Sequence, residues 1–446
     1  MVRRLFFFCA TIAWLLTACT DNDSFSSDAS HRLVFSRDTV RMDTLFSGVP
    51  STTYSFWAYN RSGDGIRIRT VRLDRGNQSG FRVNVDGTFI NPVGNDFEVR
   101  DGDSIRVFVE ITSRENLQPE AQLVEDNLLF TLESGVVQRV NLRTYSWDAE
   151  KVTNKEVTTD ETIESSMPLV VYGKGISVEK DATLTIRNTT LYFHDGAGID
   201  VKGALVLENV LLRGDRLDHM FDYLPYDRVS GQWRGIRVYP KAEGITINDS
   251  EIHSAMTGLE CDSTVVTIQS SIIHNCKGFG LYAHDSNVHL ENSLFSNTLN
   301  DCVALYGCEA GINQCTMAQF YPFSANRGVA LRFTTTKKPM LLSVYNTLMT
   351  GYPEDVVMGE KDSNEDDPEL NYYLENCLLR TPALEDTERI KDVIFEKSSD
   401  AVQGKAHFML FDDYKFIYDF RVLETSPAYE KHIGWQNLPT ETEQEQ

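Results

Sequence analysis

The chain has 446 residues, and its 42 Lys and Arg residues against 65 Asp and Glu residues give a formal net charge of −23 at pH 7. This acidic balance argues against nucleic-acid binding, and it would repel a polyanionic glycan unless a cation or local basic residues intervened. The length is sufficient for two or three domains with a sizeable core.

The N-terminus has the composition of a secretion signal that ends in a lone cysteine. Two arginines precede the apolar run LFFFCATIAWLL (5–16), which is too short to span about 30 Å of hydrocarbon. The ending LTAC resembles the lipobox of bacterial lipoproteins. The resemblance implies a signal peptide at residues 1–18 and acylation of Cys19, which would anchor the protein in a lipid bilayer. The alternative is an ordinary signal peptide with an incidental cysteine.

An acidic tract follows the cysteine. The sequence DNDSFSSD (21–28) is similar to the export tag of surface lipoproteins in one group of Gram-negative bacteria. This similarity implies a surface-exposed position on the bacterial outer membrane. The Ser and Asp content alone predicts a flexible tether over residues 19–30.

Residues 31–148 show short alternating strands separated by Gly- and Asp-rich turns. The predicted strands are TVRMDTLF, TYSFWAY, IRIRTVRL, FRVNV, SIRVFVEI, NLLFTL and VVQRVNLRTY. About seven strands in this length predict an antiparallel β-sandwich that resembles immunoglobulin-like domains. We interpret this domain as a spacer rather than a binding domain, and the polar segment 149–167 as a junction or cap.

The middle of the chain contains an internal repeat of about 21 residues, with some longer units that carry loops. Each unit contains the pattern apolar, x, apolar, x, turn residue, compact residue, x, apolar. The turn residues are Asn188, Asn209, Asp249, Ser270, Asn292, Gln314, Asn346 and Asn376. Asn tolerates the left-handed backbone conformation that tight turns require, which explains its prevalence in this column.

This repeat resembles the right-handed parallel β-helix family, which includes pectate lyases, polygalacturonases and many surface proteins. The resemblance covers residues 168–435, and DFRVLETSPAYEKHIG (419–434) is similar to the closing segment of such helices. The sequence therefore predicts an all-β protein with an N-terminal sandwich, a right-handed parallel β-helix and a polar tail at 436–446. The repeat specifies the fold and says little about function.

Six cysteines lie within or near the repeat: Cys261, Cys276, Cys302, Cys308, Cys315 and Cys377. Cys315 and Cys377 occupy the compact position of the repeat, which predicts small core residues rather than a redox pair. An exported protein can form disulfides, and whether Cys302 and Cys308 pair is left open by the sequence.

An outward column of the predicted helix brings charged residues together. Ser177, Asp200, Arg237, Glu260 and Tyr282 occupy equivalent positions on successive units, which stack about 4.8 Å apart. If the protein is an enzyme, Asp200, Arg237 and Glu260 are its predicted catalytic residues. The alternative is a salt-bridged surface ladder, because Arg237 between two carboxylates is a favourable cross-strand arrangement without any ligand.

An aromatic-rich insertion precedes the strand of Arg237. The segment DRLDHMFDYLPYDRVSGQWR (215–234) contains Tyr223, Tyr226 and Trp233. Aromatic rings stack on sugar faces, so these residues and Tyr282 are predicted ligand-binding residues. The alternative, which we favour for Trp233, is that the rings pack the insertion onto the helix.

A second outward column contains Arg213, His253, His274 and Ser296. Stacked imidazoles could bind a metal or transfer protons, but exposed polar side chains on a β-helix face are the commoner case. The acidic stretch EKDSNEDDPE (360–369) could bind calcium, although it lacks ordered ligand spacing and is better interpreted as a solvated loop. No other cofactor is predicted.

Two functions fit these features. The preferred one is a non-catalytic surface lipoprotein whose helix presents a face to a polysaccharide or a surface protein. The alternative is a polysaccharide lyase or glycoside hydrolase acting in the same groove. The sequence lacks the NTD and GHG motifs of polygalacturonase-like enzymes, which favours the first interpretation.

Overall fold

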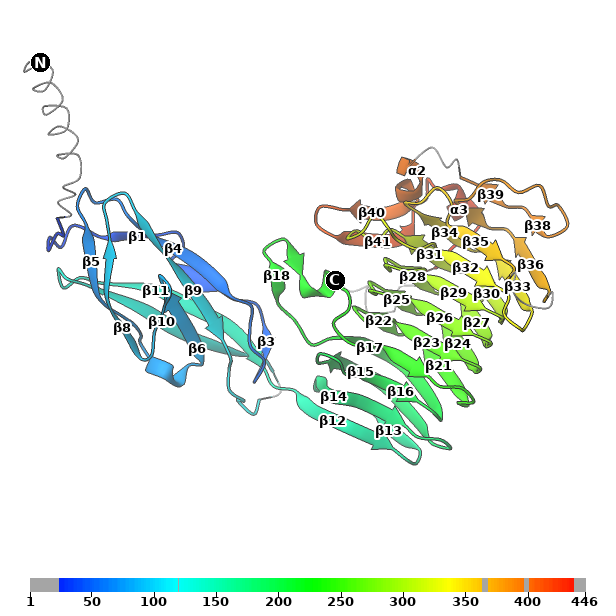
Figure 1. Ribbon diagram of the computed structural model, residues 1–446, viewed down its shortest axis with the longest axis horizontal. Coiled ribbons are helices and arrows are strands. Elements are labelled where there is room, and N and C mark those ends of the chain that lie inside the picture. Colours follow the sequence, from blue (N-terminus) through cyan, green and yellow to red (C-terminus); the bar gives the residue numbers. More distant parts are fainter. Residues whose placement is uncertain (1–23, 119, 363–367, 397–400, 437–446) are drawn as a thin grey trace, which may run out of the picture. The chain divides into compact units, whose positions relative to one another are not determined.

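The computed structural model describes residues 24–118, 120–362, 368–396 and 401–436. The chain divides into two compact units, Met1–Asp148 and Ala149–Gln446. Both units are built from β-strands, as the sequence predicts (Figure 1). No helix in the described part of the chain has the length and apolar character needed to cross a membrane.

The first unit is a sandwich of two sheets. One sheet has the order β1-β4-β9-β6-β7, and the other has the order β2-β11-β10-β5-β8 with β3 also paired to β11. Its elements are β1 (Leu33–Phe35), β2 (Thr39–Arg41), β3 (Leu45–Phe46), β4 (Tyr54–Asn60), β5 (Ile66–Leu73), the 3₁₀ turn η1 (Gly76–Gln78), β6 (Phe81–Val85), β7 (Thr88–Phe89), β8 (Val93–Val99), β9 (Ser104–Ile111), β10 (Gln122–Leu132) and β11 (Val137–Trp147).

Alternating burial explains the two layers. In β9 the residues Ile105, Val107 and Val109 are buried, while Arg106 between them is exposed. This period-2 pattern turns one face of each sheet toward a shared core. All seven predicted strand regions contain strands. The sequence prediction missed β1, β7 and β8, of which β8 contains Asp96 at a φ of 57°.

The second unit is a parallel β-helix of three stacked strand columns (Figure 1). The first column contains β16 (Gly198–Val201), β20 (Ile236–Val238), β23 (Leu259–Asp262), β26 (Leu281–His284), β29 (Val303–Tyr306), β32 (Leu331–Thr334) and β35 (Val357–Glu360). The second contains β13 (Glu161–Ile163), β21 (Gly244–Asn248), β24 (Val265–Gln269), β27 (Asn287–Glu291), β30 (Glu309–Asn313), β33 (Met340–Tyr345), β36 (Leu370–Glu375) and β38 (Ile390–Lys391).

The third column completes each coil. It contains β22 (Glu251–His253), β25 (Ile272–His274), β28 (Leu294–Ser296), β31 (Thr316–Gln319), β34 (Leu348–Gly351), β37 (Leu378–Leu379) and β39 (Ile394–Phe395). Four longer strands bend from one column into the next: β12 (Glu150–Val157), β14 (Leu169–Val178), β15 (Thr183–Phe193) and β17 (Ala204–Gly214). Because β12 and β13 pair in parallel with β14 and β15, the segment interpreted as a junction or cap forms the first coil.

The turn residues of the repeat stack in a column and share the left-handed backbone conformation. All eight turn residues named from the repeat have φ between 42° and 55°. Several of their amides bond from coil to coil: Asn209 donates to Asn188 at 3.1 Å, and Asn376 donates to Asn346 at 2.7 Å. The compact residues that follow are buried, and the hydroxyl of Ser271 accepts a bond from the backbone N–H of Ser250 at 3.1 Å. The bond to Ser271 satisfies a buried backbone N–H, and the amide bonds link neighbouring coils at the surface.

Two further segments pack against the coils. The insertion after β17 contains a two-stranded hairpin, β18 (His219–Phe221) and β19 (Leu224–Pro225), followed by the 3₁₀ turn η2 (Tyr226–Arg228). The C-terminal part contains α2 (Ala401–Ala406), the hairpin of β40 (Phe408–Asp412) and β41 (Ile417–Val422), and α3 (Pro427–Glu430). Phe408 and Phe420 of this hairpin are buried in one cluster with Phe320 of the coils.

Candidate functional site

The charged column lies on the outward side of the first strand column. Asp200, Arg237, Glu260 and Tyr282 are register neighbours on β16, β20, β23 and β26. The same column continues through Ala304 of β29 to Arg332 of β32. The structure therefore brings the predicted residues onto one continuous strip of the helix surface.

The carboxylates of this strip have separate cationic partners. Arg237 pairs with Glu260 at 3.6 Å. Asp200 instead accepts two hydrogen bonds from Arg234, at 2.7 and 2.6 Å, and a third from the Tyr239 hydroxyl at 3.2 Å. Burial opposes ionisation of Asp200, but the bonds from Arg234 outweigh it, so the pKa of this carboxyl lies below its ordinary value. A carboxylate held in this way is a poor proton donor or acceptor near neutral pH.

The insertion is anchored by a tryptophan that belongs to the core. Trp233 is only 1% exposed, and its ring stacks on Phe193 with a centroid distance of 4.2 Å. Its Nε1 donates to the backbone carbonyl of His253 at 2.8 Å. The expectation that Trp233 stacks on a sugar is therefore corrected, because its ring is enclosed by the helix.

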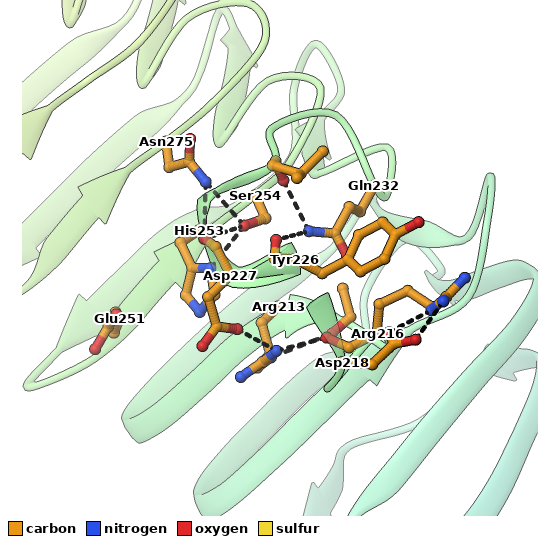
Figure 2. Close-up of polar contacts among 12 residues, drawn as sticks. Arg213, Arg216, Asp218, Tyr226, Asp227, Gln232, Glu251, His253, Ser254 and Asn275 are labelled. Carbon is orange, nitrogen blue, oxygen red and sulfur yellow. Dashed lines mark hydrogen bonds and ion pairs between the residues drawn. The ribbon is translucent and has the colours of Figure 1, made fainter. Parts of the chain in front are cut away.

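The other aromatic residues of the insertion are more accessible. Tyr223 is 63% exposed and stacks on Phe221 with a centroid distance of 5.7 Å. Tyr226 lies beneath the guanidinium of Arg216, 4.3 Å from its ring centroid, and Arg216 is held by Asp218 (Figure 2). Tyr223 thus remains available to a ligand, whereas a cation already covers one face of Tyr226.

The histidine column is covered by the insertion rather than exposed. His253 and His274 are register neighbours whose rings stack at 5.0 Å, and His253 is buried. The carbonyl of Asp227, in the insertion, accepts hydrogen bonds from Ser254 and Asn275 of the coils at 3.1 and 2.9 Å (Figure 2). The polar residues that follow β22 and β25 therefore serve to hold the insertion.

The surroundings of His253 and Glu251 shift the pKa values of both groups. Burial first, and repulsion from His274 second, hold the pKa of His253 well below its ordinary value. His274 bonds to Glu251 at 2.9 Å, and although burial raises the pKa of Glu251, this bond and the nearby cationic groups lower it to about 2. Within the described residues no group of three or more His, Cys, Asp or Glu side chains could hold a metal ion.

A hollow of about 800 Å³ lies further along the helix, beside the end of the charged column. It is formed where the third strand column passes into the first, and by the loop between β31 and β32. Its lining residues are Phe279, Leu299, Asn300, Asp301, Tyr306, Ala325, Asn326, Arg327, Gly328, Arg332, Tyr352 and Pro353. Of the four aromatic residues predicted to bind ligand, Tyr282 lies beside this hollow, because its ring is 5.3 Å from that of Tyr306.

The charged side chains of the hollow differ in how completely they are hydrogen-bonded. Arg332 donates to Asp301 at 2.7 Å, and the backbone N–H of Val329 donates to the same carboxylate at 2.8 Å. Arg327 lies 4.4 Å from the Tyr352 ring centroid and bonds to the carbonyl of Ser324, while its buried Nε has no hydrogen-bond partner. Burial lowers the pKa of Arg327. The hollow thus combines aromatic walls, amide groups and one incompletely bonded guanidinium.

Sequence reasoning missed this hollow, although the sequence contains a signal for it. The turn residues Gln314 and Asn346 are 32 positions apart rather than about 21, which marks a longer coil. The extra residues include the aromatic loop YPFSANRG (321–328), which supplies Arg327 and Gly328 to the lining.

The remaining predictions concern the cysteines and the acidic stretch. All six cysteines of the second unit are free and buried, so Cys302 and Cys308 are not paired. Cys19 and residues 363–367 of the acidic stretch lie outside the described residues. Acylation at Cys19 and calcium binding at 360–369 therefore stay predictions.

Comparison with known proteins supports the fold of the second unit. Residues 152–317 match the family model described as "Right handed beta helix region". The match and the stacked parallel strands agree on a right-handed parallel β-helix. No curated protein matches the chain.

Some solved structures show weak likeness. VesB protease of Vibrio cholerae is 13% identical with a TM-score of 0.19, over 26% of this chain and 32% of its own. A family 123 glycoside hydrolase from Clostridium perfringens is 7% identical with a TM-score of 0.19, over 28% and 26%. The chain thus spans about a third and a quarter of these two proteins. Dex49A from Penicillium minioluteum is 9% identical with a TM-score of 0.16, over 80% and 70%. Likenesses this remote indicate no function.

Proposed function

We propose that the protein is a lipid-anchored, non-catalytic surface protein whose β-helix binds a glycan in the hollow beside Tyr306. The observation that carries this proposal is the lining of the hollow, where Phe279, Tyr306 and Tyr352 lie around a volume of about 800 Å³. Ligand pockets have volumes of about 300–1,000 Å³, and aromatic rings provide flat apolar surfaces for the faces of sugar rings.

The polar groups of the hollow suit recognition of hydroxyl groups. Asn300 and Asn326 bring side-chain amides to its lining, and Arg327 brings a guanidinium whose Nε lacks a hydrogen-bond partner. A guanidinium carries five N–H donors, so Arg327 can donate further hydrogen bonds to ligand hydroxyl groups. The long, open face of the helix allows a polymer to extend beyond the hollow.

Catalysis is the less well supported alternative. Glycoside hydrolysis generally uses two carboxylates, but the described lining residues include the single carboxylate of Asp301. Its oxygens already accept bonds from Arg332 and Val329. Asp200 and Glu260, further along the strip, are likewise paired with Arg234 and Arg237. These groups act as neutralised pairs rather than as a separate acid and base.

The test is a glycan-array screen of the full chain in detergent, with ultraviolet-absorbing lyase products and new reducing ends measured in parallel. We expect binding without product, and loss of binding in Tyr306→Ala and Arg327→Gln. Tyr345→Ala is the matched control, because Tyr345 is 38% exposed on the second strand column and is not part of the hollow. Product release would establish an enzyme, and equal loss in the control would remove the hollow as the site.

The anchor needs a separate measurement. We expect the full chain to fractionate with membranes and to incorporate labelled fatty acid, and Cys19→Ser to lose both properties. A variant that still carries the label would show that acylation does not occur at Cys19.

A further inference from the structure

We propose that the N-terminal sandwich is a second binding module, which holds an acidic polysaccharide on the outward face of the sheet β1-β4-β9-β6-β7. This inference is independent of the hollow in the β-helix. It departs from the interpretation of this domain as a spacer. The face combines exposed aromatic rings, cations without carboxylate partners and a hollow of its own.

The aromatic rings form a continuous row across neighbouring strands. Trp57 and Tyr59 alternate with buried residues on β4, and their rings stack with a centroid distance of 6.4 Å. Trp57 is the register neighbour of Arg106 on β9, whose guanidinium lies 5.4 Å from the Trp57 ring and 4.9 Å from the Phe108 ring. Ring, cation and ring therefore lie in sequence on one side of the sheet.

A hollow of about 380 Å³ extends this row toward the edge of the sheet. It is lined by Arg82, Val83, Asn84, Phe89, Phe108 and Glu110. Asn84 is the register neighbour of both Phe108 and Phe89, and Phe89 is 54% exposed. The face thus continues across β4, β9, β6 and β7, which are hydrogen-bonded neighbours in this order.

Two arginines on this face lie against aromatic rings rather than against carboxylates. Arg106 donates to the Ser55 hydroxyl at 3.0 and 3.3 Å, and Arg61 lies 5.1 Å from the Tyr59 ring centroid. Neither guanidinium forms an ion pair with a carboxylate of the described residues. Arg82 at the edge of the same face instead pairs with Glu110 at 3.4 Å, as Arg67 on the opposite sheet pairs with Glu98 at 2.8 Å.

The guanidinium groups of Arg61 and Arg106 indicate the charge of the ligand. In a chain with a net charge of −23, unpaired cations beside exposed rings are the local basic residues that an anionic partner requires. A sugar ring places its apolar face on an aromatic side chain, and its carboxylate or sulfate group accepts bonds from an adjacent guanidinium. The open, extended face suits a chain of such sugars rather than one small molecule.

The experiment is affinity electrophoresis of the full chain in detergent, through gels containing polygalacturonate, dextran sulfate or neutral dextran. We expect both acidic polymers to retard the protein, less so as salt is added, and neutral dextran to leave its mobility unchanged. Trp57→Ala and Arg106→Gln should each weaken retardation by about tenfold or more. Retardation by one acidic polymer alone would identify its carboxylate or sulfate as the recognised group.

Matched controls lie on the opposite sheet. Tyr145 is 45% exposed on β11, and Arg69 is exposed on β5, so Tyr145→Ala and Arg69→Gln remove a similar ring and charge elsewhere. Both should bind like the unchanged chain, as should Tyr306→Ala, which separates this site from the β-helix hollow. The proposal is overturned if neutral dextran retards the protein equally, if neither acidic polymer does, or if Trp57→Ala and Arg106→Gln behave like the controls.

Discussion

Replacing Trp233 by alanine tests whether this residue belongs to the core or to a ligand surface. The side chain is 1% exposed, stacks on Phe193 at 4.2 Å and donates to the carbonyl of His253 at 2.8 Å. Truncation of a buried Trp costs about 3–5 kcal/mol, because apolar contacts are lost and a cavity remains. The substitution also removes the hydrogen-bond donor to the carbonyl of His253, and a buried group that loses its partner costs about 1–3 kcal/mol. We therefore expect a loss of unfolding free energy near the upper end of this range for Trp233→Ala. Trp233→Phe keeps most of the ring contact and should lose about 1–3 kcal/mol for the same reason.

The assay uses the buried cysteines as reporters. All six described cysteines lie in the second unit and are buried, so their reaction with a thiol reagent in increasing urea follows the unfolding of that unit alone. We expect the urea midpoint to fall in the order unchanged chain, Trp233→Phe, Trp233→Ala. Tyr223→Ala, on the same insertion but 63% exposed, should stay within about 0.5 kcal/mol of the unchanged chain. An unchanged midpoint for Trp233→Ala together with lost glycan binding would refute the core assignment.

Three further predictions follow from local geometry. Asn346→Ala should destabilise the second unit by about 2 kcal/mol, because a φ of 50° is strained for alanine and the bonds to Asn313 and Asn376 are lost. Asn346→Gly should cost less, because glycine adopts this φ without strain. The urea midpoints of the two variants measure the difference. The unfolding free energy should fall as the pH drops below 6.5, because the unfolded chain protonates His253 while the folded chain, which holds the pKa of this residue below that value, does not. Urea midpoints at about pH 7.5 and about pH 5 should therefore differ less in His253→Gln. At neutral pH the thiols of the second unit should not react in the native protein, because burial raises the pKa to about 12 for Cys276, Cys302, Cys315 and Cys377. Reaction of these cysteines with a thiol reagent before the unit unfolds would contradict this prediction.

The repeat could be read from the sequence because its signals are local. A turn residue such as Asn292, at a φ of 42°, and the small buried Ser293 after it recur at fixed intervals, so each coil has the same short pattern. Residues one period apart stack on neighbouring coils, so the alignment of Asp200, Arg237 and Glu260 can be predicted from the sequence. The partner of Asp200 could not be inferred in this way, because Arg234 lies in the insertion rather than on a neighbouring strand.

The accessibility of side chains was harder to infer than their register. His253 and Tyr282 both face outward from the coils, but the insertion covers His253, whereas Tyr282 is only partly buried. The periodic pattern contains no information about which outward residues a distant loop will cover. For the same reason, an aromatic residue such as Trp233 looks like a ligand contact in the sequence and is part of the core in the structure.

The hollow in the β-helix depends on contacts between segments that are far apart in the chain. Tyr352 forms part of its wall, and the hydroxyl of this residue donates to Asp413 at 2.6 Å, while Lys405 binds the same carboxylate at 2.6 Å. Phe323, in the loop between β31 and β32, packs against Phe416 of the C-terminal hairpin at 5.1 Å. These contacts fix a loop inserted into one coil against a segment that follows the last coil. Because the coils themselves repeat, it is such insertions that make one part of the helix surface chemically different from the rest. A β-helix can therefore acquire a binding site by lengthening a single turn, without any change in the repeat that specifies its fold.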